Sequence, residues 1–122
     1  MELSSTHIDS TTVVSIVGSV DALTAAEVTS FFTQQIRSGT SRMIADLSQV
    51  DFISSAGLRA VMSATKDTRK QGGDFRLAEP QPGVAKVLRV SGFISILKTF
   101  STVKEAIGSF NGGTASMGEA SQ

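Results

Sequence analysis

The pattern of hydrophobic and polar positions near the N-terminus is typical of a β-hairpin. Residues 12–17 are rich in β-branched side chains and end at Gly18, and residues 3–8 form a weaker run of the same kind. Such runs predict strands, and Asp9-Ser10 between them suits a connecting turn. We therefore expect a hairpin at the start of the chain.

The period then changes to that of a helix. Thr24 and Glu27 have the spacing of a capping box, in which the first side chain accepts the N–H three residues later. Gly39 is a typical helix stop. The face between them is formed by Val28, Phe31, Phe32, Gln35 and Ile36.

The middle of the chain predicts a crossover from one strand through a helix to the next strand. Residues 42–47 form a mostly apolar run that suits a buried strand, and we expect a loop over residues 48–53. A second helix is expected to begin at Ser54 or Ser55 and to end at Gly72-Gly73.

Residues 74–78 alternate in hydrophobicity and predict the strand that follows this helix. The order strand, helix, strand implies a right-handed crossover with parallel strands. Apolar residues from Val84 to Leu88 indicate a third helix, which starts after Pro82 and stops at Gly92. Part of the sheet is therefore expected to be parallel.

The C-terminal part predicts a last strand, a last helix and a tail. Residues 94–100 are expected to supply a short strand, and a second capping-box pattern at Thr102 starts a helix through Phe110. Residues 111–122 are small and polar, so they bury too little apolar surface to offset their ordering entropy. We expect one domain over residues 1–110 and a disordered tail.

Composition and charge narrow the class of protein. A chain of 122 residues that is 40% hydrophobic is long enough for one compact core. Eleven basic and eleven acidic residues occur without a block of like charge, which argues against a nucleic-acid partner. The absence of cysteine excludes disulfides and thiol catalysis. Without a signal-peptide pattern or an apolar run of about 20 residues, we expect a cytoplasmic protein with no membrane contact.

The richest chemical information lies in residues 46–58, where a strand end, a loop and a helix start meet. Ser54 or Ser55 can act simply as a helix cap, a common role of serine at such a position. Gly57 in the first helical turn costs about 0.5–1 kcal/mol relative to alanine. Something is therefore expected to approach the backbone closely at Gly57.

This segment closely resembles the signature of the STAS family, in particular the bacterial anti-sigma factor antagonists. The matching elements are Asp46-Leu47-Ser48, Phe52, Ser54, Ser55-Ala56 and Gly57-Leu58. Two further segments that resemble the family are Gly18-Ser19-Val20-Asp21 and Val90-Ser91-Gly92-Phe93. The resemblance implies an α/β fold, with a mixed β-sheet of about four to five strands and about four α-helices packed mainly on one face.

The resemblance also implies a partner switch that is not an enzyme and uses no metal or cofactor. The unphosphorylated protein would bind an anti-sigma factor serine kinase and release its client. Phosphorylation, here at Ser55, would abolish binding, and a serine phosphatase would reset the switch. Partner binding is assigned to Asp21, Ser54, Ser55, Ala56, Gly57 and Leu58. We expect the free domain to be a monomer.

One departure from the family pattern concerns Ser54, which stands where the family usually has Asp before the acceptor. The missing carboxylate leaves open how the kinase recognises the site, and it makes Ser54 a candidate second acceptor. Asp21 and Asp51 can supply local charge, but either can instead be a simple turn or loop residue.

Two other classes of function remain. In an enzyme Ser55 would be a nucleophile, but the sole histidine, His7, lies in a predicted edge strand, and a Gly-x-Ser-x-Gly elbow is absent. A STAS domain can also be an unmodified structural subunit of a signalling or transport assembly. Exposed apolar side chains over residues 90–96 would favour that alternative. We expect the apolar residues there to be mainly core, namely Phe93, Ile94, Ile96 and Leu97.

Overall fold

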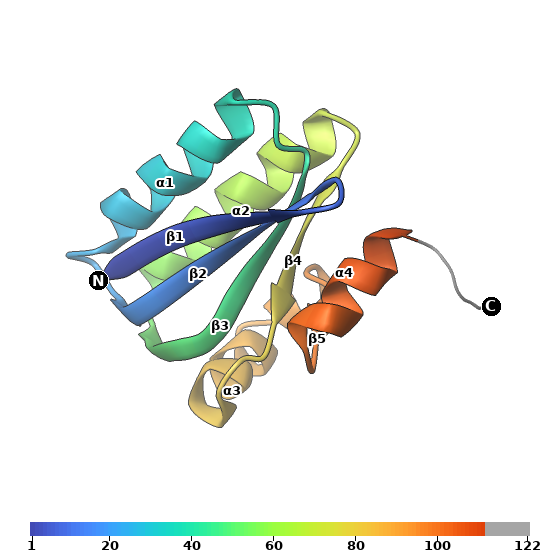
Figure 1. The fold of residues 1–122 in the computed structure, drawn as a ribbon. Helices are drawn as coiled ribbons and strands as arrows, with labels where there is room; N and C mark the ends of the chain where they lie inside the picture. The colour runs from blue at the N-terminus through green and yellow to red at the C-terminus, as the bar shows by residue number, and fades with distance from the viewer. Residues whose placement is uncertain (112–122) are drawn as a thin grey trace.

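A mixed five-stranded β-sheet forms the centre of the computed structural model, which describes residues 1–111 (Figure 1). The strands are β1 (Glu2–Ile8), β2 (Thr11–Val20), β3 (Arg42–Ile53), β4 (Asp74–Ala78) and β5 (Thr99–Phe100). The helices are α1 (Ala25–Arg37), α2 (Ser55–Lys70), α3 (Pro82–Val90) and α4 (Val103–Asn111), with a 3-10 turn, η1 (Phe93–Ser95), after α3. The strands lie in the sheet in chain order.

The predicted hairpin and parallel crossovers are confirmed. β1 pairs antiparallel with β2, and the turn between them contains Asp9 with a φ of 56°. Aspartate tolerates this left-handed conformation better than most residues. The pairs β2–β3, β3–β4 and β4–β5 are all parallel, with α1, α2 and α3 in the connections between them.

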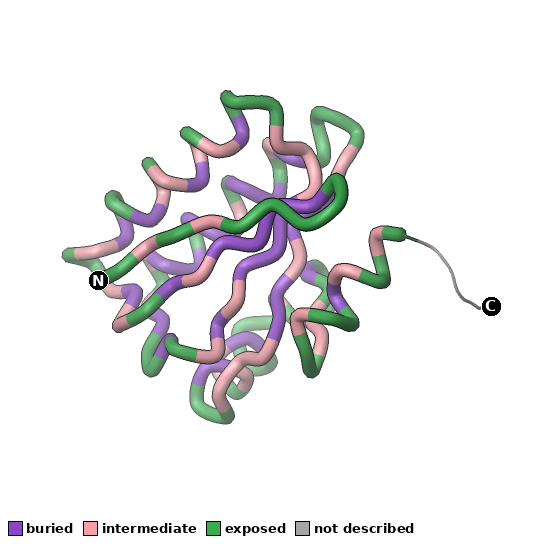
Figure 2. The backbone as a smooth tube through the Cα atoms, viewed as in Figure 1, coloured by how far each residue is buried: buried purple, intermediate pink, exposed green. Residues whose placement is uncertain are grey.

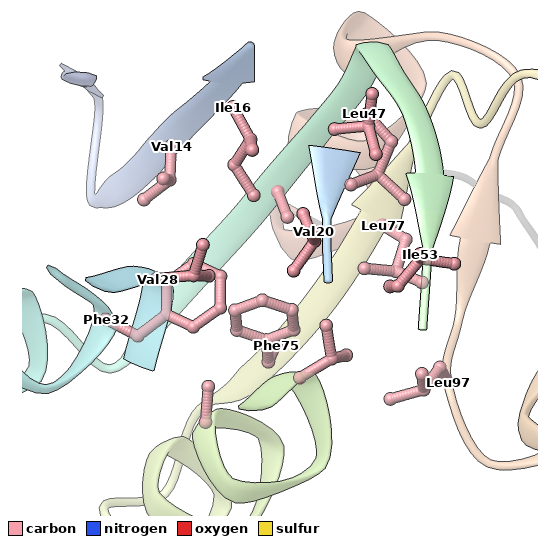
Figure 3. Close-up of a cluster of buried hydrophobic side chains, with 14 of the residues drawn as sticks. Val14, Ile16, Val20, Val28, Phe32, Leu47, Ile53, Phe75, Leu77 and Leu97 are labelled. Atoms are coloured by element: carbon pink, nitrogen blue, oxygen red, sulfur yellow. The ribbon is translucent and has the colours of Figure 1, made fainter. Parts of the chain in front are cut away.

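The sheet separates two hydrophobic layers, which confirms the prediction of helices mainly on one face. Val13 and Val14 are neighbours in β2 but face opposite layers, because successive side chains of a strand alternate. Helices α1, α2 and α3 contribute to the larger layer, and α4 covers the smaller one through Ala106. Figure 2 shows the buried centre, and Figure 3 shows the larger layer, where the rings of Phe32 and Phe75 meet edge-to-face at 5.0 Å between centroids.

The strands β2 and β3 are longer than the sequence predicted. β2 runs through Gly18 to Val20, and residues 48–53, which we expected to form a loop, are the second half of β3. Parallel pairing continues as far as Val20 opposite Ile53, with two irregularities in register. Buried Val50 and Ile53 are three residues apart, a spacing that a regular strand would place on opposite faces. The register irregularity between them allows both to join the larger hydrophobic layer.

The segment before β5 also differs from the prediction. Only the last two of residues 94–100 pair with β4, and η1 precedes them. Leu97 is buried as expected and Phe93 is half-buried, but Ile94 and Ile96 are each 42% exposed. The prediction that all four apolar side chains belong to the core is therefore wrong for the two isoleucines.

The final helix forms where it was predicted. The N–H of Glu105 donates to Thr102 Oγ1 at 3.0 Å, as the capping pattern requires. The ring of Phe110 lies under the guanidinium of Arg76, 3.9 Å from Cζ to the ring centroid, and this contact helps to hold α4 on the sheet. Asn111, assigned to the tail, is the last residue of α4. The remainder of the predicted disordered tail lies outside the described residues.

Candidate functional site

The predicted acceptor segment lies where β2 and β3 end and α2 begins (Figure 1). Because β2 and β3 are parallel, their carboxyl ends meet at the same edge of the sheet. The N–H of Ser54 donates to the carbonyl oxygen of Val20 at 2.8 Å. This hydrogen bond joins the start of α2 to the end of β2.

The two candidate acceptor serines have different surroundings. Ser54 is the half-buried N-cap of α2, and its Oγ accepts the N–H of Gly57 at 3.3 Å. Ser55 is the first residue of α2 and is exposed. Among the described residues, the Ser55 hydroxyl has no hydrogen-bond partner, whereas that of Ser54 serves as the cap. The structure thus answers which serine caps the helix.

The close approach expected at Gly57 is confirmed. A Cβ atom at this position would lie 2.8 Å from the Cγ1 atoms of Val20 and Ile53, and 2.9 Å from the Val20 carbonyl oxygen. Distances this short are essentially never seen for real Cβ atoms. Glycine therefore lets the first turn of α2 pack against the ends of two strands, which fixes the position of Ser55 on the surface.

Replacing Gly57 by alanine is expected to lower the free energy of unfolding by about 1–3 kcal/mol, because the strand ends must shift to admit the methyl group. Gly83→Ala is the matched control, since Gly83 also lies in a first helical turn but has open space around it. Urea denaturation of both variants measures the difference. If Gly57→Ala were as stable as Gly83→Ala, the tight packing at this point would be contradicted.

Asp21, rather than Thr24, organises the start of α1. Its Oδ1 accepts the N–H groups of Leu23 at 2.9 Å and Thr24 at 3.1 Å. The Thr24 hydroxyl donates to the carbonyl of Ser19 at 2.7 Å and does not cap the helix, so the predicted capping box at Thr24–Glu27 is wrong. The same hydroxyl accepts the N–H of Asp21 at 2.9 Å, so it is directed toward the turn before the helix and not toward Glu27. The Leu23 N–H, above all, lowers the pKa of Asp21, so this carboxylate stays charged.

Two exposed apolar side chains lie close in sequence to Asp21 and Asp51. Leu23 is 92% exposed in the turn before α1, and Phe52 is 50% exposed near the end of β3. Ser19 pairs with Phe52 in the sheet, and its hydroxyl donates to Asp51 Oδ1 at 2.7 Å. We call the accessible residues at this edge the Ser55 surface: Asp21, Leu23, Asp51, Phe52 and Ser55.

The remaining predicted binding residues lie beneath the Ser55 surface, in the first turn of α2. Ala56 is half-buried, and Gly57 and Leu58 are buried, with Leu58 packed in the larger hydrophobic layer. Their role in partner binding stays a prediction. Sequence reasoning missed Leu23, although its position outside the apolar period of α1 was an available signal.

Other chemistry expected or excluded from the sequence lies away from this edge. His7 is exposed in edge strand β1, as expected, and its Nδ1 lies 2.9 Å from Thr12 Oγ1. Within residues 1–111, no three His, Asp or Glu side chains are placed to hold a metal ion together. In the same part of the chain, no helix has both the length and the hydrophobicity to cross a bilayer.

Comparison with known proteins identifies the family. Residues 2–106 match the STAS domain. A protein of Bordetella bronchiseptica, assigned by name to the anti-sigma factor antagonists, is 33% identical over 110 residues, which cover 90% of this chain and 95% of that protein. A Thermotoga maritima structure assigned by title to the same group has a TM-score of 0.86 at 21% identity, covering 90% of this chain and 95% of the other.

The fold is also that of the anti-sigma factor antagonist SpoIIAA in two states. The TM-score is 0.79 for the unphosphorylated form, at 22% identity with 93% of this chain and 99% of the other covered. It is 0.68 for the phosphorylated form from Bacillus, at 21% identity with 87% and 96% covered. With residues 2–106 matched in sequence and this fold observed, the chain belongs to the STAS domain family.

Proposed function

We propose that this chain is an anti-sigma factor antagonist that works as a phosphorylation switch at Ser55. The unphosphorylated Ser55 surface binds an anti-sigma-type serine kinase, which then releases its client. Phosphate on Ser55 ends this binding, and a serine phosphatase restores it. The domain itself acts without catalysis, as a cytoplasmic monomer when no partner is bound. The assignment of the Bordetella bronchiseptica relative as an anti-sigma factor antagonist supports the class of function.

The observation that carries the proposal is the contrast between the two adjacent serines. A kinase must reach the acceptor hydroxyl and take its proton, so an exposed hydroxyl without a hydrogen-bond partner in the domain is the better acceptor. Ser55 meets this requirement. Ser54 is half-buried, and its Oγ is engaged as the cap of α2. A kinase therefore reaches the Ser54 hydroxyl less easily, and we assign the switch to Ser55 alone.

The surroundings of Ser55 allow the domain to remain folded when phosphorylated. The first turn of α2 contains no acidic residue, and a helix N-terminus attracts negative charge. Arg59 is exposed one turn further along α2, at the spacing at which helical side chains interact. A phosphate on Ser55 would therefore be stabilised within the domain, so its effect falls on the partner.

The same phosphate would oppose a docked partner. It adds about −1.5 to −2 charges and three acceptor oxygens at the centre of the Ser55 surface. The acidic residues Asp21 and Asp51 already lie on this surface, so a partner that matches the unmodified form meets much greater negative charge. To weaken a nanomolar complex to micromolar, the modification must supply about 4 kcal/mol. Burying an unpaired charge at an interface is sufficient for this.

Phosphate transfer in a lysate of the native host tests the proposal. Wild type, Ser55→Ala and Ser63→Ala are incubated with ATP and Mg²⁺, and the incorporated phosphate is measured. Ser63 is an exposed serine on the same helix and serves as the matched control. We expect labelling of wild type and Ser63→Ala and none of Ser55→Ala. Full labelling of Ser55→Ala would overturn the assignment.

A second candidate function is an unmodified structural subunit of a larger assembly. It is favoured by exposed apolar side chains at the end of α3 and just after it. Val90 is 78% exposed, and Ile94 and Ile96 are each 42% exposed. Under this alternative, the chain stays unlabelled in the lysate although a stable partner is bound. The same experiment therefore distinguishes the two functions.

A further inference from the structure

The molecule has a second accessible surface, which the Ser55 switch does not use. It is formed by the end of α3, by η1 and by the segment that leads into β5, where α3 and η1 pack together. We call it the α3–β5 surface and define it by three apolar and three basic residues: Val90, Ile94, Ile96, Lys86, Arg89 and Lys98. All six residues are exposed.

The apolar part of this surface is unusual because the core of the domain does not need it. Helix α3 already buries Val84 and Leu88 against the sheet, so its inner face is satisfied. Val90 lies on the outer face, where helical spacing places it next to Lys86, four residues earlier. Exposed apolar side chains grouped beside charged ones are typical of a binding surface.

A hollow of about 400 Å³ lies at the ends of β4 and β5, and Ile94 is the one residue of the α3–β5 surface that lines it. Pro80, Ile94 and Phe100 form its apolar lining, so Ile94 belongs to both the hollow and the exposed surface. Glu79 also lines it, but its Oε2 accepts the N–H of Val103 at 3.0 Å at the start of α4. Thr99 and Ser101 add polar lining, so an apolar side chain of a partner would contact the hollow on its Pro80, Ile94 and Phe100 side.

The charged side chains among the six residues of the α3–β5 surface are all basic, whereas Glu79 in the adjoining hollow is acidic. Residues 80–98 contain three basic side chains and no acidic one, in a chain whose overall charge is balanced. The guanidinium of Arg69 also reaches this segment, where Nη2 donates to the carbonyl of Ile96 at 3.0 Å, but its charge is paired with Asp74. Electrostatic complementarity therefore requires a partner with negative charge around an apolar anchor.

Two other occupants fit this surface less well. In a two-fold dimer the same surface meets itself, so the basic side chains of one copy would face those of the other. A membrane requires an amphipathic helix with its apolar face free to enter the lipid. The apolar face of α3 is buried in the domain.

We propose that the α3–β5 surface binds an acidic segment of a partner protein, with an apolar side chain of that segment seated beside Ile94. The contact is independent of Ser55, because the Ser55 surface is built from β2, β3 and the start of α2. Such a surface lets the domain stay attached to one protein while the phosphorylation switch acts on another.

A short peptide of Glu, Leu and Phe, labelled with fluorescein, serves as the probe. Fluorescence anisotropy measures its binding to the wild-type chain, and a counterpart peptide with Lys in place of each Glu is the negative control. We expect saturable binding of the acidic peptide alone, unchanged in Ser55→Glu. Amide chemical-shift changes in NMR spectra should cluster within residues 80–101.

Charge reversal locates the contact. The triple variant Lys86→Glu, Arg89→Glu, Lys98→Glu is expected to weaken peptide binding by at least about tenfold, because three attractive charges become repulsive. The control reverses three exposed basic residues elsewhere, Arg37→Glu, Lys66→Glu and Lys70→Glu, and should bind like wild type. Val90→Ser separately tests the apolar contribution and should also weaken binding.

Four results would overturn the proposal. Two concern the peptide: equal binding of the acidic and basic peptides, or chemical-shift changes centred outside residues 80–101. Two concern other occupants: binding to phosphatidylglycerol vesicles in place of the peptide, or a dimer in sedimentation that dissociates in Val90→Ser. The last two would assign the surface to a membrane or to a second copy of the chain.

Discussion

Ser55→Glu is expected to weaken binding of the kinase by at least about a hundredfold, which corresponds to about 2.7 kcal/mol. The glutamate carboxylate brings negative charge to the centre of the Ser55 surface, where the complex must desolvate it. Full phosphorylation adds more charge and is expected to approach a thousandfold. Calorimetric titration of the purified kinase with wild type and Ser55→Glu measures the loss.

The stability of Ser55→Glu separates lost binding from lost structure. Because α2 has no acidic residue in its first turn, the new carboxylate should stabilise the helix by about 0.3–1 kcal/mol. Ser63→Glu places the same charge on an exposed position of α2 away from its start and should bind the kinase like wild type. Normal kinase binding by a folded Ser55→Glu would contradict the switch.

The second large effect is predicted at Asp74, which joins four parts of the fold. Its Oδ1 accepts Arg69 Nε at 2.7 Å, and its Oδ2 accepts Arg76 Nε at 3.1 Å. Arg76 also donates to the Ser109 hydroxyl and lies over the Phe110 ring, both in α4. Arg69 also donates to the carbonyl of Ile96, in the segment before β5. The side chains of Asp74 and Arg76 are both nearly buried, at 11% exposed.

Asp74→Ala is therefore expected to lower the free energy of unfolding by about 3 kcal/mol, because it leaves the charge of Arg76 buried without its partner. This is a large part of the stability of an ordinary domain. Asp74→Asn keeps the shape and the acceptor oxygen, so its loss should be smaller. Urea denaturation of the three proteins measures both, and a loss below about 1 kcal/mol for Asp74→Ala would contradict the junction.

The pH dependence of Asp74 follows from its surroundings. Burial would raise its pKa, but the hydrogen bonds from Arg69, Arg76 and the Phe75 N–H outweigh burial and hold the pKa below its ordinary value of 3.8. The charged carboxylate therefore contributes stability above pH 3.8, and the contribution is lost as the pH falls through the lower folded value. The difference in stability between wild type and Asp74→Asn should shrink on acidification over that range.

The sequence predicted those features of the fold that depend on local patterns. The helical period gave α1, α2 and α3, and the β-branched run gave the core of β2. Gly57 was also informative, because a glycine in a first helical turn indicates close packing, and Val20 and Ile53 supply it.

Features that depend on tertiary pairing could not be predicted in this way. The second half of β3 contains Ser48, Gln49 and Asp51, whose polarity is typical of a loop. It forms a strand because the C-terminal half of β2 pairs with it. The spacing of Thr24 and Glu27 fits a capping box, but the Thr24 hydroxyl instead donates to the Ser19 carbonyl and accepts the Asp21 N–H.

The candidate site was also predicted only in part. The resemblance in residues 46–58 identified the acceptor segment, whereas the different roles of Ser54 and Ser55 required the position of the Gly57 amide. The exposure of Leu23 and Ile94 depends on which face each local segment turns outward, and neither side chain follows a helical or strand period.

The most direct test of the switch is to locate phosphate on the chain isolated from cells of the native host. Trypsin cuts after Arg42 and Arg59, and the peptide of residues 43–59 between them carries Ser48, Ser54 and Ser55. Fragmentation of this peptide in a mass spectrometer distinguishes the adjacent serines. We expect phosphate on Ser55 and an unmodified Ser54. Phosphate on Ser54 or Ser48 instead, or an unmodified peptide from every growth condition while a partner remains bound, would contradict it.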